Sequence, residues 1–228
     1  MPQILPQEPV LSAEVVAWGF LDYALALDRQ RELWQRRVRG EGRDTIAIVE
    51  HPAVVTLGRH APSTDILASE AALRQQSIAV VRSDRGGRAT YHGPGQAVVY
   101  PIVAIGARGI GVKSWVDLLE SALLQTLDSF GIHGLICAGR PGAWVQGKKI
   151  ASIGLRISRG VSYHGVSLNV DKRALDGFAH IVTCGMAGQP VTSLADELGG
   201  DASAVRVENV AARFANAVVH QLSNCDHG

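Results

Sequence analysis

Two stretches of this sequence gather residue types that support catalysis or ligand binding. Residues 85–96 read Arg-Gly-Gly-Arg-Ala-Thr-Tyr-His-Gly-Pro-Gly-Gln and lead directly into the apolar run 97–105. We expect this basic, glycine-rich stretch to be a loop in front of a buried strand. Because glycine lets a backbone approach a ligand closely, such a loop predicts the wall of a binding pocket. The second stretch, residues 148–185, contains a lysine in an expected strand, a His-Gly pair and a Cys-Gly pair.

Lys149 is the first candidate for acid–base chemistry. Alternate residues of a strand share a face, which assigns Lys149 to the apolar alternate residues of 151–157 and Lys148 to the face of Ser152 and Arg156. Burial disfavours the ammonium and lowers a lysine pKa, so the amine can act as an acid–base group near neutral pH. The alternative is a lysine that snorkels beside a turn, and the sequence leaves both interpretations open.

Cys184 is the candidate nucleophile. It lies in Ile-Val-Thr-Cys-Gly-Met, residues 181–186, between an expected strand and a loop. A cysteine in this setting is most often a small buried hydrophobe. A neighbouring lysine would lower the thiol pKa and raise the thiolate fraction, which is what covalent catalysis requires. Cys137 and Cys225 are weaker candidates.

Two histidines are further candidates. His92 belongs to the glycine-rich stretch, where we expect it on the ligand side. His164 precedes Gly165 in an expected strand, and a buried structural histidine is at least as consistent there as a catalytic one. Neither has a cysteine or carboxylate at metal-ligand spacing, so we expect no metal and no cofactor.

Residues 142–149 nearly fit the phosphate-loop pattern G-x-x-x-x-G-K-[ST]. Lys149 replaces the hydroxyl residue that would bind magnesium, however, and a strand rather than a helix is expected to follow. We therefore reject a nucleotide-phosphate site here.

Composition limits the class of protein. The 228 residues are 46% hydrophobic, enough for one substantial core, so we expect a single domain over 1–228. The net charge of +1 gives no reason to expect nucleic-acid or membrane binding. The first twelve residues lack the features of a secretory signal. Three widely spaced cysteines without a C-x-x-C pair fit a reducing, cytoplasmic setting.

Hydrophobic periodicity predicts the elements that position these residues. Helices are expected over 13–39, 68–75, 114–130 and 205–222, the third capped by Ser114 with Asp117 in its first turn. Strands are expected over 45–50, 54–57, 78–82, 97–105, 143–145, 148–157 and 161–170. Central strands with helices between and after them indicate an α+β domain, a mixed β-sheet with flanking helices.

The combined motifs resemble the lipoyl(octanoyl) transferase family over roughly residues 18–195. The resemblance rests on the stretch 85–96, Gly147-Lys-Lys-Ile-Ala-Ser-Ile-Gly154, His164-Gly165 with Asn169, Cys184-Gly185, and Val191-Thr-Ser-Leu194. Upstream, Glu50-His51-Pro52 and Thr56-Leu-Gly-Arg59 fit the same family. The resemblance implies a fold similar to the lipoate-protein and biotin-protein ligase catalytic domain.

The resemblance also implies a function. Such an enzyme moves an octanoyl group from octanoyl-acyl carrier protein, through a cysteine thioester, to a specific lysine of lipoyl domains in 2-oxoacid dehydrogenase complexes and the glycine cleavage H protein. We expect it to act in the cytoplasm, as a monomer and without a cofactor. The rival on the same fold is an ATP-dependent lipoate-protein ligase. A hydrolase using Cys184 and His164, or a binding module, are more distant alternatives.

Residue by residue, the resemblance assigns the thioester to Cys184 and the lysine that activates it to Lys149, with His164 as a possible supporting residue. The substrate contacts that it implies are Arg85, Gly86, Gly87, Arg88, Ala89, Thr90, Tyr91, His92, Ser152, Ile153, Gly154, Gly165, Val166 and Ser167.

Overall fold

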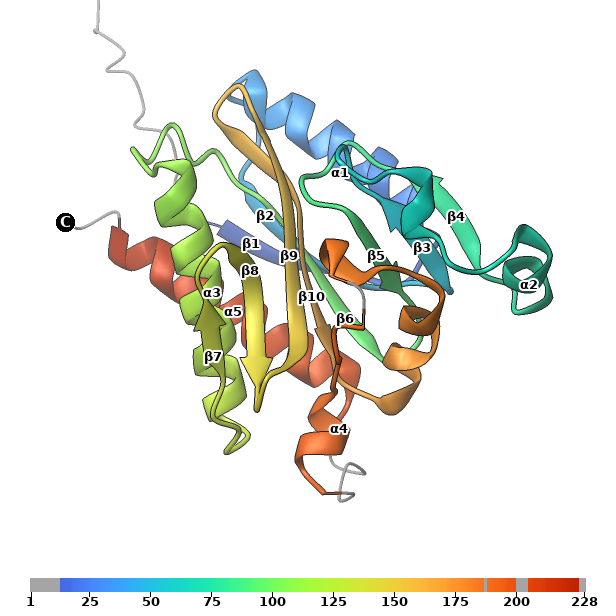
Figure 1. The fold of residues 1–228 in the computed structure, drawn as a ribbon. Coiled ribbons are helices and arrows are strands. Elements are labelled where there is room, and N and C mark those ends of the chain that lie inside the picture. Colours follow the sequence, from blue (N-terminus) through green and yellow to red (C-terminus); the bar gives the residue numbers. More distant parts are fainter. Residues whose placement is uncertain (1–12, 187, 200–204, 226–228) are drawn as a thin grey trace, which may run out of the picture.

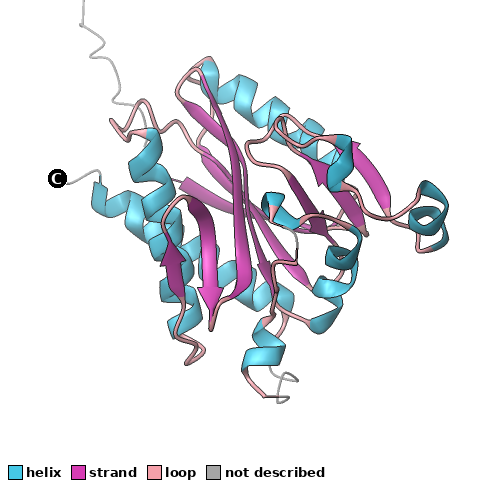
Figure 2. Cartoon of the chain, viewed as in Figure 1, coloured by secondary structure: helices cyan, strands magenta, loops and turns pink. Residues whose placement is uncertain are grey.

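The computed structural model describes residues 13–186, 188–199 and 205–225. Within these residues the strands form a seven-stranded sheet, in the order β1-β2-β6-β10-β9-β8-β7, and a three-stranded sheet, β4-β3-β5 (Figures 1 and 2). The strands are β1 (Ala13–Phe20), β2 (Asp44–Glu50), β3 (Val54–Leu57), β4 (Ala79–Arg82), β5 (Ala89–His92), β6 (Gln96–Ile102), β7 (Leu135–Cys137), β8 (Arg140–Val145), β9 (Lys148–Ser158) and β10 (Val161–Asn169). The helices are α1 (Tyr23–Val38), α2 (Glu70–Gln75), α3 (Val112–Asp128), α4 (Leu194–Glu197) and α5 (Val207–Cys225), with 3₁₀ turns η1 (Ser63–Asp65), η2 (Lys172–His180) and η3 (Thr183–Gly185).

The large sheet is buried on both faces because its central strands are apolar throughout. In β6, Ala97 and Val99 pack beneath α3 and α5, whereas Val98 and Tyr100 pack with α1 on the other face. Figure 1 shows α3 and α5 side by side on one side of the sheet and α1 on the other. β1 pairs with β2 in parallel and the neighbouring pairs are antiparallel, so the predicted mixed sheet with flanking helices is confirmed.

The small sheet carries the glycine-rich stretch. β3 pairs in parallel with β4 and antiparallel with β5, and a separate apolar cluster including Val55, Leu57, Tyr91 and Phe178 supports it. Residues 89–92 are therefore a strand, and the expectation of a loop throughout 85–96 is wrong. The pairing of β5 with β3 satisfies backbone groups that a loop would leave to water.

The expected helix over 13–39 is wrong in its first third. Residues 13–20 form β1, and α1 begins only after Asp22, whose side chain accepts a hydrogen bond from the Ala24 N–H at 2.8 Å. Val16 and Trp18, two residues apart, pack against the core, so the period here is that of a strand. Gly19 has a φ of +67°, which an α-helix does not accommodate.

The start of α3 also differs from the prediction. Gly111 caps the helix without a side-chain hydrogen bond, and Ser114 lies inside the first turn. Asp117 instead forms an ion pair with Lys113 one turn earlier, at 2.6 Å. The apolar stripe placed the helix correctly, but a serine near its start was not the cap.

Other expected elements are confirmed within a few residues. The β8–β9 hairpin turns at Gln146 and Gly147, both with positive φ, and the last helix runs over Val207–Cys225 rather than 205–222. Across the part of the chain that the structure describes, no helix is both long enough and apolar enough to cross a membrane.

Candidate functional site

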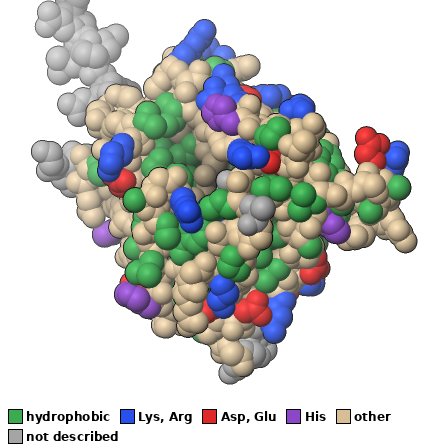
Figure 3. Space-filling model, in the orientation of Figure 1, with side chains coloured by type: hydrophobic (Ala, Val, Ile, Leu, Met, Phe, Trp, Pro, Cys, Tyr) green, Lys and Arg blue, Asp and Glu red, His purple; other side chains and the backbone are tan. Residues whose placement is uncertain are grey.

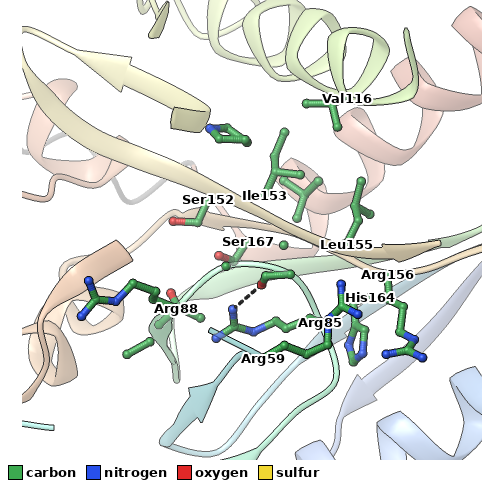
Figure 4. Close-up of a pocket in the computed structure, with 18 of the residues that line it drawn as sticks. Arg59, Arg85, Arg88, Val116, Ser152, Ile153, Leu155, Arg156, His164 and Ser167 are labelled. Atoms are coloured by element: carbon green, nitrogen blue, oxygen red, sulfur yellow. Dashed lines mark hydrogen bonds between the residues drawn. The ribbon is translucent and has the colours of Figure 1, made fainter. Parts of the chain in front are cut away.

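A cavity of about 770 Å³ lies between the glycine-rich stretch, strands β9 and β10, and the start of α3. The face shown in Figure 3 carries arginine and lysine side chains among hydrophobic ones. In Figure 4, Ser152 and Ser167 lie toward Arg85 and Arg88, while Ile153 and Leu155 lie toward Val116 of α3. The residues lining it are Tyr23, Arg59, Arg85, Gly86, Gly87, Arg88, Ala89, Thr90, His92, Val98, Tyr100, Val112, Val116, Gly139, Arg140, Pro141, Lys149, Ser152, Ile153, Gly154, Leu155, Arg156, Ile157, His164, Gly165, Val166, Ser167 and Met186.

Lys149 lines this cavity, but not on the face that strand alternation assigned to it. The β8–β9 pairing has a β-bulge, because Ala143 pairs with Ala151 while the next residue, Trp144, pairs with Lys149. Ile150 and Ala151 consequently both pack in the core beneath α3 and α5. The bulge breaks the alternation, so Lys149 falls on the face of Ser152 rather than on that of Ile153, and residues of both faces line the cavity.

Among the described residues, no carboxylate forms an ion pair with the Lys149 amine. The side chain is only 3% exposed, and its Nζ donates a hydrogen bond to the Pro141 carbonyl at 3.1 Å. Nζ also lies 4.8 Å from the ring centroid of Trp144, which favours a cation. The adjacent Lys148 differs completely: its side chain is 36% exposed and forms an ion pair with Glu197. The predicted burial of Lys149 is thus confirmed, but it results from the β-bulge and not from simple strand alternation.

The backbone of Cys184 lies in the η3 turn, and its side chain is outside what the structure describes. On one side of the turn, the Val182 N–H donates to the Asp65 carbonyl at 2.7 Å. On the other side, the segment returns to β9, where the Lys149 N–H donates to the Pro190 carbonyl at 2.9 Å. Met186 lines the same cavity as Lys149. The fold therefore brings the Cys184 turn to the cavity that Lys149 borders.

Two arginines of the glycine-rich stretch are held by the small sheet and the turns around it. The buried Arg85 donates to the Thr56 hydroxyl at 2.8 Å and to its carbonyl at 2.6 Å. Arg88 forms a bidentate pair with the buried Asp65, and the Arg88 side chain lies against Gly185, where a Cβ would come within 2.6 Å of it. Arg88 therefore joins the glycine-rich stretch to the Cys184 turn.

A second series of hydrogen bonds runs from His92 through the Gln96 and Asn169 side chains to the main chain of Lys149. His92 Nδ1 lies 2.7 Å from the Gln96 side-chain oxygen, and the Gln96 amide donates to Asn169 at 2.9 Å. Asn169 donates to the Thr192 carbonyl, and the Thr192 N–H donates to the Lys149 carbonyl at 3.0 Å. Each group is buried, so the network fixes the relative position of β5, β6, β10 and the segment after Cys184.

Aromatic and imidazole rings pack together around Tyr23, beside the cavity. His51 Nδ1 lies 2.6 Å from the Leu21 carbonyl, so this nitrogen carries the proton, and Nε2 lies 2.8 Å from the Tyr100 hydroxyl. Burial lowers the pKa of His51 to about 4 and that of His92 to about 3. The Tyr23 ring stacks on His92 with centroids 5.9 Å apart. Both histidines are therefore neutral at physiological pH.

Asp84 and His164 form a separate pair at the cavity wall. His164 Nε2 lies 2.7 Å from the Asp84 carboxylate, which also accepts the Tyr163 hydroxyl at 2.6 Å. The His164 hydrogen bond is the main reason that the pKa of Asp84 is well below its usual range. Burial lowers the pKa of His164, and burial together with Asp84 raises that of Tyr163 to about 12. His164 Nδ1 is buried without a hydrogen-bond partner among the described residues, and the residue has a φ of +57°.

Most of the predicted substrate contacts border the cavity. Tyr91 does not: alternation along β5 turns it into the small-sheet cluster, with its ring 5.8 Å from that of Phe178. Neither Cys137 nor Cys225 is among the residues that line the cavity. Sequence reasoning gave no role to Tyr23 or Asp84, because a tyrosine inside an expected helix and an aspartate beside the glycine-rich stretch carry no motif of their own.

Comparison with known proteins agrees with this architecture. The profile of the lipoyl protein ligase A/B catalytic domain matches residues 22–219. An octanoyltransferase of Alkaliphilus metalliredigens is 48% identical over 186 residues, covering 81% of this chain and 85% of that protein. An octanoyltransferase of Corynebacterium glutamicum is 38% identical over 228 residues, covering 96% and 86%.

A solved structure extends the likeness to the fold. The bipartite lipoate protein ligase of Thermoplasma acidophilum superposes with a TM-score of 0.67 at 14% identity, covering 92% of this chain and 84% of the other. At that identity the likeness concerns the fold alone. Together with the profile and the two relatives, it assigns the chain: it belongs to the lipoyl protein ligase A/B catalytic-domain family and, within that family, to the octanoyltransferases, which are acyltransferases.

Proposed function

We propose that this chain transfers an octanoyl group from octanoyl-acyl carrier protein, through a thioester on Cys184, to a specific lysine of lipoyl domains. The observation that carries the proposal is the 38–48% identity to proteins named octanoyltransferase over most of both chains. The acceptors would be the lipoyl domains of 2-oxoacid dehydrogenase complexes and the glycine cleavage H protein.

The position of Lys149 supports the covalent route. A buried amine beside a neutral carbonyl can gain and lose a proton without breaking an ion pair, which suits an acid–base group. The segment after Cys184 is hydrogen-bonded to the Lys149 main chain, because the Lys149 N–H donates to the Pro190 carbonyl and the Lys149 carbonyl accepts from the Thr192 N–H. These bonds support a cysteine turn near the amine.

The proposed reaction balances in two steps. The Cys184 thiol gives its proton to the neutral Lys149 amine, and the thiolate attacks the thioester carbonyl of the donor. The bond from that carbonyl to the pantetheine sulfur breaks, and the departing thiolate takes the proton from Lys149. The acceptor lysine amine then attacks the Cys184 thioester, loses a proton to Lys149, and forms an amide as the cysteine leaves and is reprotonated.

The cavity supports an acyl substrate. Val98, Val116, Ile153, Leu155 and Ile157 give it an apolar wall, and a volume of about 770 Å³ exceeds what an eight-carbon chain needs. Burial of each methylene contributes roughly 0.8 kcal/mol to binding. Ser152, Ser167 and the glycine-rich stretch supply polar groups to orient the thioester, and we propose the cavity-lining members of the predicted set as substrate contacts.

The test is intact-protein mass spectrometry after mixing the chain with octanoyl-acyl carrier protein, without ATP. We expect one octanoyl adduct, mapped to Cys184 and discharged when a lipoyl domain is added. Cys184→Ala should form no adduct, while the matched control Cys137→Ala should form it normally. Full transfer by Cys184→Ala would exclude the thioester, and modification of the lipoyl domain only with ATP and free octanoate would indicate a ligase instead.

A further inference from the structure

The peptide unit between Pro141 and Gly142 is hydrogen-bonded on both of its sides. Its carbonyl accepts from Lys149 Nζ at 3.1 Å. Its N–H donates to Glu120 Oε1 of helix α3, also at 3.1 Å. A single planar, polarisable peptide group therefore stands between the Glu120 carboxylate and the Lys149 amine.

The backbone at Gly142 fixes this peptide in place. Gly142 has a φ of +134°, which is open to glycine alone, and a Cβ there would lie 2.2 Å from the Ala151 carbonyl oxygen. The same Cβ would lie 3.2 Å from Cε of Lys149, so backbone and amine are in close contact. Gly142, the first glycine of the phosphate-loop pattern in the sequence, is thus required by the β-bulge that sets the direction of the Lys149 side chain.

Glu120 occupies a desolvated position for a carboxylate. It is 9% exposed, and burial is the main reason that its pKa is raised. Asp117 of the same helix adds to the rise, whereas the Gly142 N–H, Lys113 and Lys149 oppose it. A buried glutamate is costly unless its charge is compensated, and the groups that compensate it here include the Gly142 peptide and Lys149.

We infer that Glu120 is a positioning residue for Lys149: it orients the Pro141–Gly142 peptide that receives the amine, and its charge stabilises the ammonium form. The effect of Glu120 on the rate of transfer rests on the proposed function, whereas its effect on Lys149 itself does not. Nothing in the reaction requires Glu120 to touch the substrate, and it is not among the residues lining the cavity.

The test measures Lys149 directly. The folded chain is labelled briefly with acetic anhydride over a range of pH, and peptide mass spectrometry quantifies acetylation at Lys149, with Lys148 as the internal reference. Glu120→Gln keeps an acceptor for the Gly142 N–H but removes the charge. The ammonium loses that stabilisation, so the labelling midpoint of Lys149 should move down by roughly half a unit to one pH unit, while that of Lys148 stays constant.

The matched control is Asp117→Asn, one turn earlier on α3, which removes an exposed carboxylate paired with Lys113. It should leave the Lys149 midpoint unchanged. In transfer assays, Glu120→Ala should lower kcat about tenfold or more with KM within about twofold, and Glu120→Gln should recover most of the loss.

The outcomes separate this inference from the proposed function. An unchanged Lys149 midpoint in Glu120→Gln overturns the positioning role, even if the wild-type chain forms the Cys184 thioester. A lowered midpoint in a chain that forms no thioester supports the positioning role and rejects the proposed function.

Discussion

Two sets of residues beside the cavity hold charge differently: Lys149 at the β-bulge, here called the reactive end, and the residues around Tyr23 and Asp84, here called the histidine end. At the β-bulge, Lys149 is held by a neutral carbonyl and an aromatic ring. Around Tyr23 and Asp84, each titratable group has a fixed state. His51 and His92 are neutral because burial lowers their pKa values. Asp84 is ionised because its hydrogen bond with His164 lowers the pKa of the Asp84 carboxyl.

This difference in protonation behaviour suggests that Lys149 takes part in the reaction, whereas the histidines serve the structure. Lys149 donates directly to the neutral Pro141 carbonyl, and the Glu120 carboxylate lies beyond the Pro141–Gly142 peptide group, so Lys149 can change its protonation state without breaking a direct ion pair. His51 and His92 also have neutral partners, but their pKa values of about 4 and about 3 keep them neutral throughout the physiological range. We therefore expect substitutions at the first end to alter rate, and those at the second to alter stability and binding.

Lys149→Met should have the largest effect. Methionine keeps much of the buried volume but carries no proton, so octanoyl transfer should fall by about 10³-fold, within the range for loss of a general acid–base group. Steady-state transfer to a lipoyl domain, with circular dichroism to confirm folding, checks this.

Lys148→Met is the matched control for that experiment. It removes a partly exposed ammonium and leaves the buried Glu197 side chain without that ion pair, so the chain should lose stability while the transfer rate changes by less than about threefold. Equal losses in the two variants would mean that the bulge does not distinguish the lysines, and the comparison of the two ends would fail.

Acid should destabilise the fold through the histidine end. The folded-state pKa values of His51 and His92, about 4 and about 3, lie below the ordinary value of 6.5. Between those values the unfolded chain binds more protons, so stability is complete above pH 6.5 and is lost as pH falls toward 3. Each histidine should contribute a slope of up to about 1.4 kcal/mol per pH unit.

Urea unfolding at several pH values measures that slope. His51→Gln should reduce it by one histidine's share, and the exposed His60→Gln should leave it unchanged. A wild-type slope near zero between pH 6.5 and 4 would contradict the neutral histidine end.

Asp84→Asn should affect stability and binding more than chemistry. It weakens the hydrogen bonds to His164 and Tyr163 and removes the charge near Arg156, at a cost of about 1–2 kcal/mol in the free energy of unfolding. Because Asp84 precedes the glycine-rich stretch, KM for the acyl donor should rise while kcat changes little. A selective fall in kcat would assign Asp84 to the reactive end.

Thr90→Val should have the smallest effect on stability. Thr90 lines the cavity, and its buried hydroxyl has no hydrogen-bond partner among the described residues. Replacing it with a methyl group should leave the free energy of unfolding within about 1 kcal/mol of wild type. If the hydroxyl meets substrate, KM should rise a few-fold, and an unchanged KM would remove Thr90 from the proposed contacts.

Much of the fold followed from periodicity alone. The strand over 54–57 was predicted with its observed bounds and β9 within one residue, because alternation, turn residues and apolar runs are local signals, whereas β8 begins three residues before its predicted start. β1 was mistaken for helix because Val16 and Phe20 also fit helical spacing, and its state depends on pairing with β2, thirty residues away. Short strands such as β7 gave no signal of their own.

In the candidate site, too, some residues were predicted from local sequence signals and others were found only in the structure. Residue type and motif identified Lys149, the glycine-rich stretch and the Cys184 turn without any coordinates. Tyr91 was included with its neighbours because a motif assigns a stretch as a whole, whereas a strand sends alternate side chains to opposite faces. Asp84, Gln96 and Glu120 act through partners far along the chain, which no local pattern reveals.

By itself, then, the sequence determined the family, the α+β class and the residues able to do chemistry, because these depend on composition, spacing and local propensity. Only the tertiary structure decided which way Lys149 faces. That direction depends on the β-bulge, which places one extra residue of β9 opposite β8. It also depends on Gly142, where any side chain would collide with the Ala151 carbonyl. Register between strands is a property of their pairing, so neither strand's sequence alone specifies it.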